Sequence, residues 1–175
     1  MTRKALHHYS ELNTYQFVTF RTQDSVDAYL LGIHGNPNLS ASEKQMKIDE
    51  YCDLSNKGCY LKGEILTLTM GYIKKLEPEY YQLYAVSIMP NHVHLLFQQK
   101  QALSVVMQKI KGATAFYINQ HLSRKGHFWE KSYFDKALRD EKHFHVVYEY
   151  IKNNAVKANL SDADLRFYGT LENLI

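Results

Sequence analysis

The sequence predicts a single α+β domain, because short runs with strand-like alternation stand between longer runs with helical periodicity. Two strand-like runs on either side of Pro90-Asn91 indicate a β-hairpin, which also favours this class. The chain has 175 residues, enough for one domain with a substantial hydrophobic core. There is no internal repeat, low-complexity tract or linker, so we expect the domain to span residues 1–175.

The first strand is expected over residues 15–21, which alternate and are rich in β-forming residues. Phe17 and Val18 are neighbours and must face opposite sides of a sheet, which favours a central strand covered on both faces. Residues 22–41 contain two glycines and a proline and predict a loop or a short, poorly patterned element.

Two helices are expected before the hairpin. Ser40 or Ser42 can cap the first, whose apolar pattern is weak and which ends at residues 56–58. The second is expected over about 62–76 and is closed by Pro78. Its apolar stripe consists of Ile65, Leu66, Leu68, Thr69, Tyr72 and Ile73.

The hairpin is expected to pair residues 81–89 with residues 92–98, and Pro90-Asn91 suits a tight turn between them. Side chains alternate along a strand, so His92 and His94 point to the same face. The opposite face carries Val93, Leu95 and Phe97, which we expect in the core.

The remaining chain predicts a long helix over about 104–123, an extended aromatic stretch over 128–134 and a last helix over 141–154. The buried side of the long helix should carry Val106, Ile110, Ala113, Tyr117 and Leu122. Asp140 can cap the last helix. The apolar stripe of the last helix is Phe144, Val147, Tyr148 and Ile151. A polar tail follows from Ser161 and ends in a possible short docking segment.

His92 and His94 are the first candidates for chemistry. Two imidazoles a few ångströms apart on one rigid face can form half of a divalent-metal site. The alternative is a pair of polar residues on the solvent-exposed face of a half-buried strand, since His-x-His alone has low specificity.

Tyr150 and Asn154 lie four residues apart on the last helix, on a face outside its apolar stripe. The amide oxygen of Asn154 can complete a coordination sphere begun by two imidazoles, and the phenol of Tyr150 can reach a phosphate held by the metal. The alternative is that Tyr150 is a half-buried aromatic and Asn154 a helix C-terminal residue.

Together these residues suggest metal-assisted attack by a tyrosine on a phosphodiester. A divalent ion, Mg²⁺ or Mn²⁺, would polarise the phosphate. Attack by the tyrosinate would leave a covalent phosphotyrosine that conserves the bond energy, so the strand can later be rejoined.

Basic residues could hold a nucleic acid. The net charge of +3 and the pI of about 8.7 permit nucleic-acid binding without establishing it. Between residues 109 and 142 there are eight basic residues against four acidic ones, interleaved with aromatics. The candidate nucleic-acid contacts are Lys109, Lys111, Arg124, Lys131, Arg139 and, by base stacking, Trp129. The alternative is a solvated helix face with buried aromatics.

Cys52 and Cys59 match no zinc or redox spacing and suggest free thiols in a reducing cytoplasm. The sequence contains no signal peptide and no apolar run long enough to cross a membrane, so no membrane partner is expected.

The segment Met89–Leu96 resembles the His-hydrophobe-His signature of the HUH single-tyrosine transposases. The similarity continues in residues 109–112, 128–135, 139–141 and 150–158. These stretches are most similar to the REP-associated tyrosine transposases, domesticated bacterial relatives of the IS-two-hundred-like elements. The ordered set covers roughly residues 12 to 160.

This resemblance implies a ferredoxin-like antiparallel sheet with packed helices, and cleavage and rejoining of single-stranded DNA at hairpin-forming repeats. It implies that His92 and His94 are metal ligands, Tyr150 the nucleophile and Asn154 the third ligand. Two positions depart from the family pattern: Ala155 replaces the usual proline and Asn159 the usual glycine, and both lie just past the site at the end of the helix.

The resemblance also implies a protein of the bacterial cytoplasm that associates with the nucleoid. Two assemblies stay open: a monomer with the tyrosine acting on its own His pair, or a homodimer with swapped tyrosine helices. Two other functions also stay open: a hairpin-DNA-binding relative without catalysis, and a metal phosphodiesterase that uses water.

Overall fold

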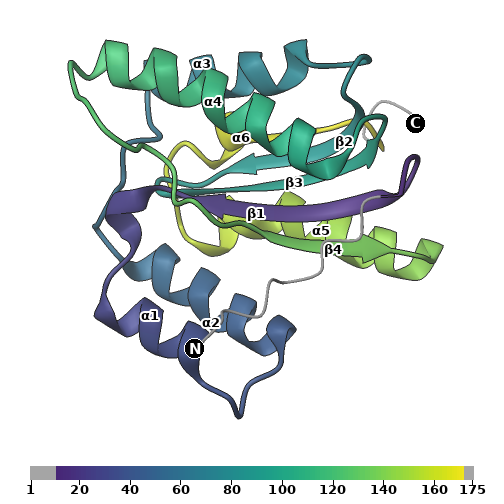
Figure 1. Cartoon of the computed structure of the whole chain (residues 1–175), viewed down its shortest axis with the longest axis horizontal. Helices are drawn as coiled ribbons and strands as arrows, with labels where there is room; N and C mark the ends of the chain where they lie inside the picture. Colours follow the sequence, from purple (N-terminus) through teal and green to yellow (C-terminus); the bar gives the residue numbers. More distant parts are fainter. Residues whose placement is uncertain (1–10, 172–175) are drawn as a thin grey trace.

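A computed structural model describes residues 11–171 and shows an α+β fold built on one antiparallel sheet (Figure 1). Its strands are β1 (Tyr15–Arg21), β2 (Tyr81–Ile88), β3 (His92–Gln99), β4 (Phe134–Leu138) and β5 (Phe167–Gly169). They lie in the order β4-β1-β3-β2-β5, with every neighbouring pair antiparallel. The first four strands and their helical connections form the expected ferredoxin-like arrangement, to which β5 adds an edge strand.

The helices divide between the two faces of the sheet. They are the 3₁₀ turn η1 (Gln23–Ser25), α1 (Ala28–Gly35), α2 (Ala41–Leu54), α3 (Glu64–Lys75), α4 (Leu103–His121), α5 (Glu141–Lys157) and α6 (Ala163–Arg166). Helices α3 and α4 cover one face, and α5 lies on the opposite side together with the α1–α2 pair (Figure 1). The two faces of the sheet are therefore packed against different helices.

Capping signals in the sequence correctly placed the starts of two helices. Ser40 caps α2 through a capping box in which its hydroxyl accepts from the backbone of Glu43 and the Glu43 carboxylate accepts from the backbone of Ser40. Asp140 caps α5 by accepting from the backbone N–H of His143. Asn159, just beyond the end of α5, has a φ of 55°, a left-handed conformation that glycine adopts most easily and asparagine tolerates.

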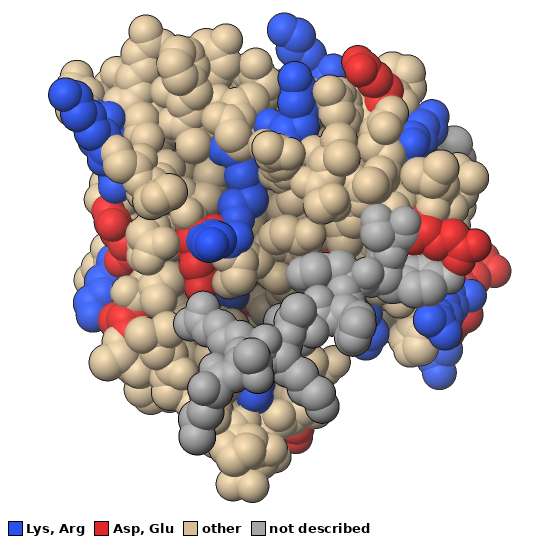
Figure 2. Space-filling view, in the orientation of Figure 1, with Lys and Arg blue, Asp and Glu red and all other residues tan. Residues whose placement is uncertain are grey.

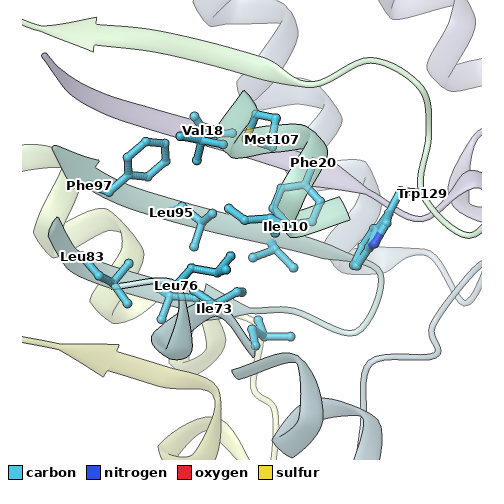
Figure 3. Close-up of a cluster of buried hydrophobic side chains, with 14 of the residues drawn as sticks. Val18, Phe20, Ile73, Leu76, Leu83, Leu95, Phe97, Met107, Ile110 and Trp129 are labelled. Atoms are coloured by element: carbon cyan, nitrogen blue, oxygen red, sulfur yellow. The ribbon is translucent and has the colours of Figure 1, made fainter. Parts of the chain in front are cut away.

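The main hydrophobic core lies between the sheet and the α3–α4 layer. Val93, Leu95 and Phe97 of β3 all point into it, as the alternation predicted. Figure 3 shows Leu95 and Phe97 in this core together with Met107 and Ile110 of α4. The other face of the sheet carries a second apolar cluster, formed by Phe17, Ala85, Leu96, Leu138, Tyr148 and Ile151. Strand β1 is therefore buried on both faces, as expected from Phe17 and Val18.

Several expectations need correction. Residues 22–41 are not mainly a loop, because Asp27 caps α1, which packs on α2 through a separate cluster of Leu30, Ile33, Ile48 and Cys52. Tyr117, expected to be buried, is 40% exposed, since Thr114 and Ile118 take the inward positions of α4.

The segments on either side of α5 also differ from expectation. Within 128–134 only Trp129 forms an isolated bridge, and β4 begins at Phe134. The tail from Ser161 forms α6 and then β5, which pairs with β2. The end of the tail, where a short docking segment was expected, lies outside the described residues.

Cys52 and Cys59 are free thiols, as predicted. Among residues 11–171 no helix combines the length and the apolar character needed to cross a membrane.

Candidate functional site

His92 and His94 face the α5 side of the sheet, with their ring centroids 4.8 Å apart. The strand alternation therefore placed them correctly on one face. They do not lie on a solvent-exposed surface, because their exposed fractions are only 1% and 0%. Buried polar groups are normally hydrogen-bonded, so the partners of each ring nitrogen indicate how the two imidazoles are used.

The Nδ1 atom of each imidazole is hydrogen-bonded to a neighbouring side chain. Thr19 Oγ1 lies 2.7 Å from His94 Nδ1, and Asn91 Oδ1 lies 2.7 Å from His92 Nδ1. The Asn91 amide nitrogen donates to the backbone oxygens of Cys52 and Lys57, so its oxygen must face His92. We therefore assign the His92 proton to Nδ1, which leaves the Nε2 lone pair for a ligand.

Both Nε2 atoms are buried and have no hydrogen-bond partner. Asp49 of α2 is the third member of this group. One ligand atom from each of Asp49, His92 and His94 lies within 4.8 Å of the others, the one such His, Cys, Asp or Glu cluster found among the described residues. Two imidazoles and a carboxylate are a donor set suited to a divalent metal.

The sequence analysis missed Asp49. Its helix has a weak apolar pattern and carries acidic residues over much of its length. The one available signal was Asp49 and Asp53 at a spacing of one helical turn, which places both carboxylates on the same face. In the structure Asp53 Oδ1 lies 3.7 Å from His92 Nε2.

Burial determines the charge state of the cluster. Burial, together with the positive charge of Arg21, lowers the pKa of His94 to about 3, and it lowers the pKa of His92 well below its usual range. Burial raises the pKa of Asp49 to about 7, against the opposing effects of the Tyr150 hydrogen bond and Arg21. The imidazoles are thus neutral at physiological pH, the form that binds metals.

Tyr150 of α5 reaches the same cluster from the other side. Its hydroxyl donates to Asp49 Oδ2 at 2.8 Å, and its ring centroid lies 5.4 Å from that of His94. Burial and the nearby Asp49 raise the pKa of the phenol above its usual value. The phenol and the two imidazoles therefore converge within one chain, which is the spatial arrangement that the sequence hypothesis required.

Asn154, one turn beyond Tyr150, is also buried, and its Nδ2 atom has no hydrogen-bond partner. Its role as a metal ligand stays a prediction, since the carboxylate of Asp49 joins the two imidazoles in the observed cluster.

Arg21, at the end of β1, is a second residue that the sequence analysis did not identify. It pairs with His92 in the register of β1 and β3, and its side chain is 3% exposed. Its Nε lies 3.0 Å from Glu130 Oε2, while Nη1 is buried and has no hydrogen-bond partner.

Three of the expected DNA contacts, Trp129, Lys111 and Arg124, are buried or half-buried and contact other parts of the fold. Trp129 is buried in the main core, where its Nε1 donates to Thr114 Oγ1 at 2.9 Å, so its expected stacking role is corrected to one in packing. Lys111 Nζ donates to the backbone oxygens of Glu130, Lys131 and Ser132 and ties down the segment before β4. Arg124 lies over the rings of Tyr60 and Phe128 and pairs with Asp24 at 3.3 Å.

The other expected contacts, Lys109, Lys131 and Arg139, are exposed. Arg139 follows Leu138, which pairs with Tyr15 at the end of the sheet away from His92. Figure 2 shows that Lys and Arg side chains are scattered over the visible face and form no continuous basic surface there. The DNA-contact residues therefore remain predictions.

Comparison with known proteins identifies the family of the sequence and structures with a similar fold. The sequence matches the family described as "Transposase IS200 like" over residues 55–154. A solved structure of a REP-associated tyrosine transposase bound to a REP hairpin is similar in fold, with a TM-score of 0.53 and 16% identity over 93% of this chain and 77% of that one.

A crystal structure of a candidate transposase from Deinococcus radiodurans is also similar, with a TM-score of 0.48 and 17% identity over 88% of this chain and 98% of that one. No curated protein matches the chain in sequence.

Proposed function

Since this chain belongs to the IS200-like transposase family, we propose that it uses Tyr150 to cut and rejoin single-stranded, hairpin-forming DNA with the help of a divalent metal. The observation that carries this proposal is the convergence of the Tyr150 hydroxyl, Asp49 and two unpartnered imidazole nitrogens. The hairpin bound to the structurally similar REP-associated transposase supports this class of substrate. We further propose that the whole chain acts as one catalytic domain.

The residues of the site fit a metal ion. His92 and His94 would hold it through Nε2 and Asp49 through a carboxylate oxygen, with Asn154 as the additional ligand that the resemblance implies. The observation in favour of this fit is that the two buried Nε2 atoms have no hydrogen-bond partner. A bound Mg²⁺ or Mn²⁺ would polarise the scissile phosphate.

Tyr150 would act as the nucleophile. Its hydroxyl gives up a proton, for which Asp49 Oδ2 is the acceptor in the structure, and its oxygen forms a bond to phosphorus. The bond between phosphorus and the 3′ oxygen breaks, and that oxygen takes up a proton as the leaving 3′-hydroxyl. The product is a 5′-phosphotyrosine, and because the phosphodiester energy is retained, a 3′-hydroxyl can later reverse the step.

Substrate access depends on α2. Its contacts with the rest of the site are polar: Asp49 accepts from Tyr150, and the Cys52 backbone oxygen accepts from Asn91. Because His92 and His94 are buried and α2 contacts α5 through the Asp49–Tyr150 hydrogen bond, we propose that a DNA phosphate reaches them when α2 moves away from α5. Tyr150 and the His pair already meet within one chain, which supports a monomer acting in cis over a swapped dimer.

The test uses an end-labelled single-stranded hairpin oligonucleotide with Mn²⁺. We expect a covalent protein–DNA adduct that survives denaturation and disappears in Tyr150→Phe. Tyr148→Phe is the matched control, because Tyr148 lies two residues away in the apolar cluster of α5, and it should keep the adduct. A gel shift without cleavage would contradict the proposal, as would cleavage that persists in Tyr150→Phe.

A further inference from the structure

Within the described residues 11–171 two arginines are buried, Arg21 and Arg166, and their hydrogen bonding differs. Arg166 uses Nε and Nη2 for the Asp162 carboxylate and donates from Nη1 to the backbone oxygens of Leu61 and Ile88. Arg21 pairs through Nε with Glu130, but its Nη1 is buried without a partner. Leaving a buried charged donor unpaired is costly, so a structural role alone does not explain Arg21.

The place of Arg21 in the sheet directs it toward the site. Phe17, Thr19 and Arg21 alternate onto one face of β1. Phe17 packs against the rings of His94 and Tyr150, and Thr19 hydrogen-bonds to His94. Arg21 is the next residue on this face and lies directly opposite His92. Its charge also lowers the pKa of both histidines and of Asp49, as expected for a neighbour of all three.

The Arg21–Glu130 pair is not needed to attach the segment before β4. The backbone N–H of Glu130 already donates to the Arg21 backbone oxygen at 2.9 Å, and Lys111 holds the same segment through three backbone oxygens. The carboxylate of Glu130 instead fixes the direction of the guanidinium, as expected where a donor must be oriented before its ligand arrives.

We propose that Arg21 is a catalytic residue that binds the scissile phosphate, with Nη1 donating to a non-bridging oxygen while Tyr150 attacks. The proposal rests on the function proposed above and adds the group that carries the phosphate charge. A guanidinium suits this role because it is always charged and its planar donors match phosphate oxygens. In an enclosed site its effect on developing charge is larger than in water.

The test compares Arg21→Gln and Arg21→Lys with Arg166→Lys, a change at the other buried arginine. Each is assayed for adduct formation on a normal strand and on a strand with a neutral methylphosphonate at the scissile position. On the normal strand we expect Arg21→Gln to reduce the adduct rate at saturating DNA by at least about 100-fold. Arg21→Lys should retain part of the rate.

The methylphosphonate strand separates a phosphate contact from a structural defect. It lacks the charge that Arg21 would neutralise, so wild type and Arg21→Gln should differ there by no more than about threefold. Arg166→Lys should lower the free energy of unfolding and leave the adduct rate of folded protein unchanged on both strands. Glu130→Gln, which keeps the guanidinium and weakens its orientation, is the second variant if Arg21→Gln does not fold, and it should show a smaller loss with the same dependence on the strand.

An equal loss on both strands, or an unchanged rate on the normal strand, would overturn the role of Arg21. Either result would leave the proposed function standing as long as wild type forms the Tyr150 adduct. A wild type that forms no adduct on either strand would refute the proposed function and this inference together.

Discussion

The two faces of the sheet differ in what they bury. The face under α3 and α4 is almost entirely apolar, with Leu95, Phe97, Met107 and Ile110 among its members (Figure 3). The face toward α2 and α5 buries polar and ionisable side chains: Thr19, Arg21, Asp49, His92, His94 and Asn154. Apolar burial stabilises the fold, whereas buried polar groups have a desolvation cost unless a partner compensates it. The first face therefore accounts mainly for stability and the second for chemistry.

Strands β1 and β3 contribute side chains to both faces of the sheet. Val93, Leu95 and Phe97 of β3 enter the apolar core, while His92 and His94, which alternate with them, enter the polar site. A rigid core on one side thus fixes the positions of the imidazoles on the other. This arrangement follows the general rule that a site is most accurate when regular elements carry it.

The largest expected effect is on the free energy of unfolding, and measuring metal affinity beside it distinguishes the two faces of the sheet. Phe97→Ala should reduce the free energy of unfolding by about 3–5 kcal/mol, because it leaves a cavity in the main core. The folded variant should keep its metal affinity. Phe17→Ala, on the other face, is the comparison, because Phe17 contacts the rings of both His94 and Tyr150. Urea titrations and calorimetric Mn²⁺ titrations should show loss of stability in both variants and loss of metal affinity only in Phe17→Ala.

A smaller effect tests the donor set of the polar face. Asp49→Asn should weaken Mn²⁺ binding in the absence of DNA by at least about tenfold, since it removes a charged ligand from the cluster. Asp53→Asn is the control, because Asp53 lies near His92 but outside the three-residue cluster. Equal Mn²⁺ affinity in Asp49→Asn and wild type would exclude Asp49 as a ligand and favour Asn154.

The smallest effect concerns a buried charge with a structural role. The Arg166 guanidinium holds the pKa of Asp162 below its ordinary value of 3.8. The stabilisation from this pair is therefore present above that value and is lost as the pH falls through the lowered pKa of the folded state. Unfolding free energies measured between about pH 5 and pH 2 should fall more steeply in wild type than in Asp162→Asn. Parallel profiles would show that the pair adds nothing to acid stability.

The sequence pattern was sufficient to predict those elements that depend on interactions between residues close together in the chain. The hairpin, the shared direction of His92 and His94 and the caps at Ser40 and Asp140 follow from side-chain alternation and from short-range hydrogen bonds. The family resemblance supplied the ferredoxin-like fold, which the sheet order confirms. Trp129 was wrongly assigned to DNA stacking. An aromatic residue among basic residues gives the same sequence pattern whether its ring lies on the surface or in the core.

By itself, the sequence determined β1, the β2–β3 hairpin and helices α2 to α5, and that two imidazoles and a phenol are available for one site. It did not predict α1, α6 or β5. Only the tertiary structure decided that Asp49 and Arg21 join them. Asp49 is 101 positions from the tyrosine hydroxyl that it contacts, and Arg21 meets the His pair through strand pairing. Such contacts depend on how α2 and β1 pack against distant segments, and no local periodicity encodes that packing.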